Sequence, residues 1–115
     1  MTTDATIRRA RRVIDVMEEL RKVAPHCGTN TVIAFIKVAT EPGATIGSVQ
    51  QAIGLPPTAT ARAIGILLRK ARGQEGLDLI EARPDAIDGR VKHLYLTRKG
   101  ERIWDTMKKH LDGTF

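Results

Sequence analysis

The sequence predicts a mainly α-helical domain with a small antiparallel β-hairpin, a winged helix-turn-helix with the element order ααααββα. Apolar residues recur at helical spacing over most of the first seventy residues and again near the end of the chain. Between Leu79 and Leu96 the pattern changes to short strand-like runs separated by turn residues. A length of 115 residues fits one compact domain, residues 1–115.

The first predicted helix covers residues 5–24, with Thr3 or Asp4 as its cap. Its apolar stripe consists of Ile7, Ala10, Val13, Ile14, Met17, Leu20 and Ala24, and charged residues occupy the opposite face. Pro25 and Gly28 interrupt the pattern. A second helix is predicted from about Asn30 to Ala39, ending where Glu41 is followed by Pro and Gly.

A third, short helix is predicted to begin near Thr45 and to close at Gly54. The turn from Leu55 to Thr58 leads into a fourth helix, for which Thr58 is the predicted cap and which ends before Gly73. Two short helices joined by a tight turn that contains Gly predict a helix-turn-helix.

The predicted strands are residues 79–83 and 91–96, and the turn residues between them are Pro84, Asp85, Asp88 and Gly89. This hairpin is the predicted wing. A final helix covers residues 98–112, with Ile103, Trp104, Met107 and Leu111 as its apolar residues.

A formal net charge of +6 favours a polyanionic partner, because basic surfaces attract phosphates. Between Thr45 and Gln74 the chain carries four basic residues and no acidic one: Arg62, Arg69, Lys70 and Arg72. No apolar run is long enough to span a membrane, and the start lacks a signal-peptide pattern, so a cytoplasmic protein without a membrane partner is expected.

The sequence offers no pattern for catalysis, and no enzyme activity is expected. It lacks a recognisable Ser-His-Asp or Cys-His motif, paired carboxylates in an apolar frame and a phosphate-binding glycine loop. Cys27 is a lone cysteine, and His26, His93 and His110 lack the spacing of metal ligands. Neither a metal site nor a cofactor is expected.

One stretch resembles the wing signature of the MarR family of bacterial regulators: Asp88-Gly89-Arg90 followed, after five residues, by Leu96-Thr97 and then Gly100. Residues 79–85 are similar to that family's first wing strand and turn. Gly54-Leu55 with Thr58, Thr60, Arg62 and Leu67 resembles its recognition helix and the preceding turn. The chain departs from the family in three ways: a longer connection from Ala71 to Asp78, Pro56-Pro57 in place of a polar pair, and a short C-terminal part.

The resemblance implies a transcriptional regulator that binds double-stranded DNA sequence-specifically. It also implies a homodimer assembled through helices 5–24 and 98–112, although the short C-terminal part leaves the dimer geometry open. A small-molecule effector is compatible with the family, but the sequence names none.

The fourth helix supplies the first candidate DNA contacts. Arg62 is the candidate base reader, because a guanidinium can bind guanine bidentately. Thr58, Ala59, Ala61 and Arg69 are expected to face outward beside it. Thr58 either contacts DNA or only caps the helix, and Thr60 either contacts DNA or packs inward. Thr45 and Ser48, at the start of the third helix, either hold a phosphate or serve only as caps.

The wing supplies the second group. The resemblance implies that Arg90 reaches the minor groove and that Asp88 orients it. Lys92 shares the strand face of Arg90, and Arg83 on the facing strand adds positive charge. The alternative is that all three residues belong to a solvated face of the hairpin and do not contact DNA.

Three alternatives keep the fold and change the role. The chain could bind DNA in replication, plasmid or phage maintenance, or could be a winged-helix module that binds protein. It could also be a ligand or redox sensor: Cys27 beside His26 is either a peroxide-sensitive thiol or an inert one.

Overall fold

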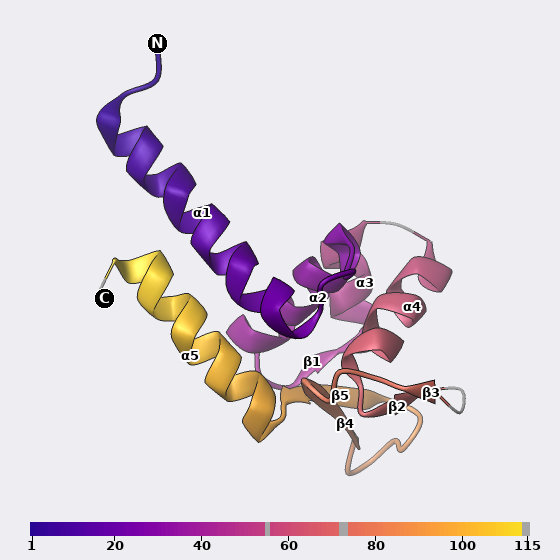
Figure 1. Cartoon of the computed structure of the whole chain (residues 1–115). Helices are drawn as coiled ribbons and strands as arrows, with labels where there is room; N and C mark the ends of the chain where they lie inside the picture. Colours follow the sequence, from indigo (N-terminus) through magenta and orange to yellow (C-terminus); the bar gives the residue numbers. More distant parts are fainter. Residues whose placement is uncertain (55, 72–73, 114–115) are drawn as a thin grey trace.

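The structure, a computed structural model, describes residues 1–54, 56–71 and 74–113. The helices of this part are α1 (Asp4–Val23), α2 (Thr29–Thr40), α3 (Ile46–Ile53), α4 (Pro57–Leu67) and α5 (Arg98–Asp112). The strands are β1 (Ala44–Thr45), β2 (Lys70–Ala71), β3 (Gln74–Glu75), β4 (Ile80–Pro84) and β5 (Lys92–Leu96). Figure 1 shows α3 and α4 as a helix-turn-helix above the β4–β5 hairpin, which confirms the predicted winged helix.

The sheet is larger than the sequence predicts. β4 and β5 form the antiparallel wing, and the two-residue strand β1 adds to the other edge of β5, giving the order β1-β5-β4. Ala44 of β1 faces Leu94 of β5. A strand of two residues is too short to show an alternating pattern in the sequence, so its pairing could not be predicted from the sequence. β2 and β3 form a separate two-stranded sheet within the long connection after α4.

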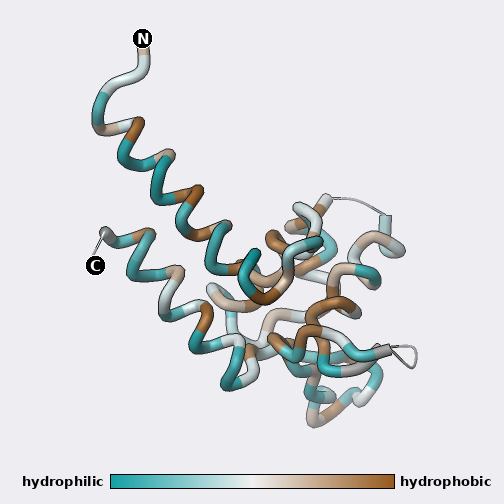
Figure 2. Tube along the Cα trace, viewed as in Figure 1, coloured by the Kyte–Doolittle hydropathy of each residue, from teal (hydrophilic) through white to brown (hydrophobic). Residues whose placement is uncertain are grey.

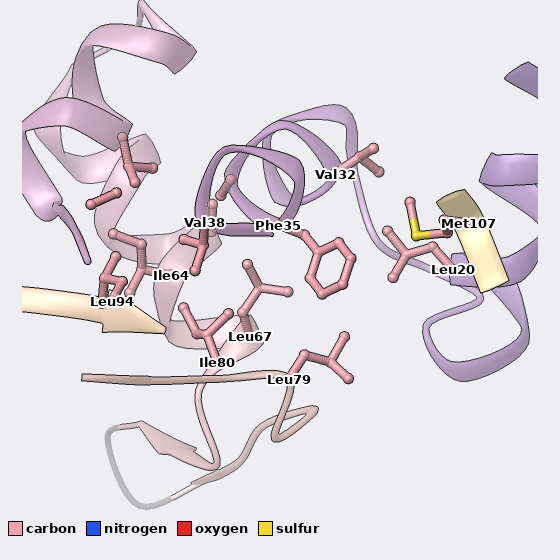
Figure 3. Packing of buried hydrophobic residues seen from close by; sticks show 14 of the residues in the cluster. Leu20, Val32, Phe35, Val38, Ile64, Leu67, Leu79, Ile80, Leu94 and Met107 are labelled. Atoms are coloured by element: carbon pink, nitrogen blue, oxygen red, sulfur yellow. The ribbon is translucent and has the colours of Figure 1, made fainter. Parts of the chain in front are cut away.

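The core lies between α2, α4 and the inner face of the sheet. Phe35 of α2 is fully buried, with Leu67 and Leu79 on one side and the pair Leu20 and Met107 on the other (Figure 3). The remaining buried apolar residues of this cluster are Val16, Val32, Ala34, Val38, Ala44, Val49, Ala63, Ile64, Ile80 and Leu94. Aliphatic side chains therefore provide most of the burial that holds the helix-turn-helix and wing together.

Helices α1 and α5 lie side by side and project away from the rest of the domain (Figure 1). Leu20 and Met107 are buried where the two helices join the core. Farther along, His110 Nε2 of α5 lies 3.3 Å from Glu19 Oε1 of α1, and Arg12 Nη1 donates to the Leu111 carbonyl at 3.4 Å. Polar contacts therefore join the two helices beyond the core.

Much of the predicted apolar stripe of α1 is exposed. The exposed apolar residues of the pair are Ile7 (47%), Val13 (57%), Ile14 (58%), Met17 (43%) and, on α5, Leu111 (43%). In Figure 2 hydrophobic segments recur along α1 well beyond the core. Leu20 and Ala24 are buried as predicted, and Val16 joins them. The stripe therefore continues past the part of α1 that the core covers.

The connection between α4 and the wing closes the C-terminal end of α4. The last carbonyls of a helix have no partner within it and need one from elsewhere. Four consecutive backbone N–H groups supply this: those of Gly76, Leu77, Asp78 and Leu79 donate to the carbonyls of Arg69, Ile66, Leu68 and Leu67, respectively, at 2.8–3.3 Å. A Cβ at Gly76 would lie 1.8 Å from the Leu68 carbonyl oxygen, so this approach requires glycine.

The Leu-Thr-x-x-Gly motif fastens α5 to the end of this connection. The Thr97 hydroxyl donates to the Asp78 carbonyl at 2.6 Å and accepts from the Gly100 N–H at 3.0 Å, so it caps α5 while binding the preceding strand segment. Gly100 packs against the Leu79 carbonyl, which a Cβ would approach to 2.1 Å. The motif is therefore explained by packing at a helix start.

Candidate nucleic-acid interface

Helix α4 has one buried and one exposed face. Ala63, Ile64 and Leu67 are buried, whereas Ala61 and Arg62 are exposed. Arg62 makes no hydrogen bond or ion pair to the described residues. In a helix-turn-helix the N-terminal half of the second helix is the part that enters the major groove. The sequence prediction that Ala61 and Arg62 face outward is confirmed.

The start of α4 differs from the prediction. Pro56 occupies the cap position and Pro57 the first helical position, and no side chain caps the helix. Thr58 is therefore not the cap; it is an exposed residue of the first turn. Proline suits the first helical position because its missing N–H would have no partner there. Leu55, in the predicted turn, lies outside the described residues.

Thr60, a candidate DNA contact, is buried and does not belong to the candidate site. Its side chain is 1% exposed and belongs to the inward face of α4, so it packs in the core and is removed from the surface of the helix. Its hydroxyl has no hydrogen-bond partner among the described residues. The sequence left two alternatives for Thr60, a DNA contact or inward packing, and its burial shows that it packs inward.

A groove of about 270 Å³ lies beside Arg62, between α4 and the start of α2. Its polar lining comes from Arg62 together with Thr29, Asn30 and Thr31, and Ala59, Ala63 and Ile66 form its apolar side. The start of α2 has no side-chain cap. Sequence reasoning missed Thr29 and Asn30, because only the fold brings the start of α2 next to α4.

Thr45 and Ser48 cap α3. The Ser48 N–H donates to the Thr45 hydroxyl oxygen at 3.2 Å, and the Ser48 hydroxyl donates to the Thr45 carbonyl at the same distance. Both residues are half-buried. The capping alternative therefore describes their geometry in this structure.

The wing turn contains a tightly organised arginine. Asp88 Oδ1 accepts from the Arg90 backbone N–H and from Nε, both at 3.1 Å, and Oδ2 accepts from Nη2 at 3.2 Å. The Arg90 side chain is 92% exposed. Arg90 also holds the pKa of the Asp88 carboxyl below its usual range, through its side-chain and backbone hydrogen bonds. The expected pairing of Asp88 with Arg90 is confirmed.

Asp85 and His93 form hydrogen bonds at the base of this turn. Asp85 Oδ2 accepts from the N–H groups of Ile87 and Asp88, both at 3.0 Å, while Oδ1 lies 2.8 Å from His93 Nε2. These bonds, led by that of the Asp88 N–H and followed by His93, lower the pKa of Asp85 to about 2. The sequence identified Asp85 only as a turn residue and gave His93 no role.

The other basic candidates are distributed over the surface. Lys92 is half-buried and lies on the same face of β5 as Leu94. Arg83 lies on the opposite face of the hairpin. Its guanidinium stacks on Tyr95, at 4.4 Å from the ring centroid, and pairs with Glu81. Arg69 is exposed just beyond the end of α4. Arg72 lies outside the described residues.

The remaining observations concern the lone cysteine, clusters of metal-ligating side chains and membrane-spanning helices. Partial burial raises the pKa of the Cys27 thiol, which lowers the fraction of reactive thiolate. In the described ranges, no three His, Cys, Asp or Glu side chains cluster as a metal site would require. Nor does any described helix combine the length and the apolar character that crossing a bilayer demands.

Several solved structures share this fold. MarR aligns over 95% of this chain and 72% of its own, with 22% sequence identity and a TM-score of 0.64. FabT of Streptococcus pneumoniae, solved in complex with DNA, aligns over 95% and 71%, with 21% identity and a TM-score of 0.70. PcaV of Streptomyces coelicolor, solved with its natural ligand, aligns over 97% and 74%, with 22% identity and a TM-score of 0.61.

These similarities establish the winged-helix fold of this chain over nearly its whole length. Neither a protein-family model nor a curated protein sequence matches the chain. The resemblance seen in the wing motif therefore agrees with the structural comparison, and the function has to be argued from the site.

Proposed function

We propose that this protein is a MarR-like transcriptional regulator that binds double-stranded DNA sequence-specifically as a homodimer. The observation that carries the proposal is the exposed Arg62 face of α4, combined with a wing turn in which Asp88 orients an exposed Arg90. A reading helix and a charged wing on one body are the parts that a winged helix needs to engage two grooves.

In this proposal Arg62 reads a base in the major groove, with Thr58 and Ala61 beside it. Arginine supplies two parallel donors to guanine O6 and N7, a geometry that no neutral residue of similar length reproduces. Thr29 and Asn30, across the groove from Arg62, are suited to contact the neighbouring phosphates. Arg69, close to the far end of α4, adds attraction without reading sequence.

The wing contributes positioning and charge. A flexible cation loses less conformational entropy on binding if a carboxylate already orients it. Arg90 is held in this way at an exposed turn, so it is suited to enter a minor groove, where narrow A/T-rich segments attract arginine. Lys92 and Arg83 add positive charge to the two faces of the hairpin.

The homodimer is proposed from the exposed stripe of α1. Ile7, Val13, Ile14 and Met17, with Leu111 of α5, place large apolar side chains in water on a pair of helices that projects from the domain. A second copy that presents the same stripe would cover it around a two-fold axis. Two α4 helices would then face successive major grooves, about 34 Å apart.

Selection of bound duplexes from a random DNA pool tests the proposal. The expected result is an enriched palindromic sequence with half-sites about one helical turn apart. Recovery of unrelated sequences would rule out sequence-specific recognition and favour an architectural role in replication or plasmid maintenance. A chain that binds no duplex even at low salt would instead be the protein-interaction module.

A further inference from the structure

The pairing of β5 with β1 attaches the wing strands to the body of the domain, and a His93 side chain links the wing turn to the same body segment. His93 Nδ1 lies 2.9 Å from the carbonyl oxygen of Gly43, in the turn between α2 and β1, and Nε2 lies 2.8 Å from Asp85 Oδ1 in the wing turn. The ring therefore bridges the wing turn to a segment that lies fifty residues before His93 in the sequence. Its side chain is 30% exposed, so water and protons reach it.

Both neighbours of the ring are acceptors. A peptide carbonyl can only accept a hydrogen bond, and so can an ionised carboxylate. A protonated imidazole has two N–H donors and satisfies both, whereas a neutral imidazole has one donor and leaves a nitrogen lone pair facing an oxygen. The bridge is therefore complete only when His93 is protonated.

The bridge continues into the DNA-binding tip. The carboxylate that contacts His93 also fixes the N–H groups of Ile87 and Asp88, and Asp88 in turn orients Arg90. A chain of hydrogen bonds thus runs from Gly43 on the body, through His93 and Asp85, to the base of the Arg90 turn. Loss of the His93 bridge removes this side-chain link between the turn and the body, whereas the β1–β5 pairing and every charge that would contact DNA remain.

We propose that His93 is a positioning residue that locks the wing turn onto the body of the domain when its ring is protonated and releases the turn when the ring is neutral, so that DNA affinity falls as pH rises. This inference rests on the proposed function. The Gly43 carbonyl and the Asp85 carboxylate raise the pKa of His93 above its ordinary value of 6.5, so the locked state extends into the neutral range.

The other charged groups around His93 come from the wing turn, from β4 and from the α2 side. Asp85, with a pKa of about 2, remains ionised. On β4, the cross-strand partner Arg83 is a permanent cation paired with Glu81. On the α2 side, Glu41 pairs with Lys37 at 2.8 Å. The strand neighbours of His93 are Thr45 of β1 and Tyr95 of β5.

The sign follows from the raised pKa of His93. The locked wing is fully populated below pH 6.5 and is lost as the pH rises through the folded-state pKa of His93. Because DNA is proposed to bind the locked form more tightly, we expect the affinity to fall by roughly three- to tenfold across the transition.

The test measures the dissociation constant for a selected duplex by fluorescence anisotropy from pH 5.5 to 8.5 at constant ionic strength. The wild type is expected to weaken by this roughly three- to tenfold factor more than His93→Gln, which cannot change charge. His26→Gln, altered at an exposed turn, serves as the matched control and should retain the wild-type profile. Asp85→Asn should move the transition to lower pH. Identical profiles for the wild type and His93→Gln would overturn the proposal.

A second measurement is independent of DNA. The ¹⁵N shifts of the His93 ring and the {¹H}-¹⁵N NOE values of the Ile87 and Asp88 amides are followed over the same pH range. An amide mobility that rises as His93 deprotonates supports the proposed bridge. An amide mobility that stays constant while His93 deprotonates overturns it. If the protein binds no duplex at any pH, the proposed function fails, while this measurement still decides the role of His93.

Discussion

The Asp88 carboxylate accepts three hydrogen bonds from Arg90, from its backbone N–H, Nε and Nη2, at 3.1–3.2 Å, although the Arg90 side chain is 92% exposed. Exposed ion pairs contribute little to stability, so this arrangement is better explained by what it does to the position of the cation. It holds the guanidinium in one orientation at the tip of the wing.

Replacement of Arg90 by alanine should weaken binding to all duplexes by about 1–3 kcal/mol and reduce the slope of log K against log salt by about 1, because one cation is lost. Asp88→Ala should weaken binding less and leave the slope unchanged, since the cation remains but is no longer oriented. Anisotropy titrations over a salt series measure both. Wild-type affinity for Arg90→Ala at every salt concentration would show that the wing does not touch DNA.

Arg62→Ala should weaken binding to the selected site by about 1–3 kcal/mol and relax the preference at one base pair of each half-site. Arg8→Ala, which removes the same charge from an exposed position on α1, is the control and should leave that preference intact. The measurement is repeated selection with each variant. An equal loss on specific and random duplexes would make Arg62 a phosphate contact.

Thr60→Val should raise the free energy of unfolding by about 1 kcal/mol. The change replaces a buried hydroxyl that lacks a partner with a methyl group of nearly the same shape, which removes its desolvation cost. Thr60→Ser keeps the hydroxyl and deletes the methyl, so it should destabilise the domain by about 1 kcal/mol. Urea unfolding measures both. Destabilisation by Thr60→Val would mean that the hydroxyl is satisfied after all.

Gly100→Ala should destabilise the domain by about 1–3 kcal/mol, because its Cβ would lie 2.1 Å from the Leu79 carbonyl oxygen and force the start of α5 away from the sheet. Gly47→Ala in α3 is the matched control. Its Cβ would meet nothing nearer than 3.8 Å, and alanine favours the helix by about 0.5–1 kcal/mol. Thermal and urea unfolding distinguish the two, and equal effects would refute the packing explanation.

Ile14→Glu should convert a dimer into a monomer of 12.7 kDa at micromolar concentration, because it places a charge in the middle of the exposed stripe of α1. Arg8→Glu, on the polar side of the same helix, should leave the mass at twice that of one chain. Sedimentation equilibrium provides the readout. A wild type that stays monomeric on concentration and on addition of DNA would exclude the proposed interface.

Local chemistry explains why so many element boundaries were predictable from the sequence. Thr3, Thr45 and Thr97 each accept a hydrogen bond from a backbone N–H three residues ahead, and Gly54 ends α3 in the left-handed region with φ +69°. These signals involve only neighbours in the chain. The Asp88–Arg90 pair is similarly local, so the sequence motif was sufficient to predict it.

Contacts between distant segments were not predictable in the same way. The strand β1 exists only because Ala44 meets Leu94, and the role of His93 depends on Gly43. The burial of Thr60 depends on how α4 is rotated against α2, which a short helix with apolar residues on several sides does not define. Such features require the tertiary fold, because no pattern within one element contains them.

Sequence-specific DNA binding is tested by comparing the salt dependence of binding to the selected duplex and to a scrambled duplex of equal length. We expect tighter binding to the selected duplex at every salt concentration, a steep linear fall of log K with log salt for both, and a smaller difference between them in Arg62→Ala. Equal affinities for the two duplexes, or binding that does not respond to salt, would contradict it.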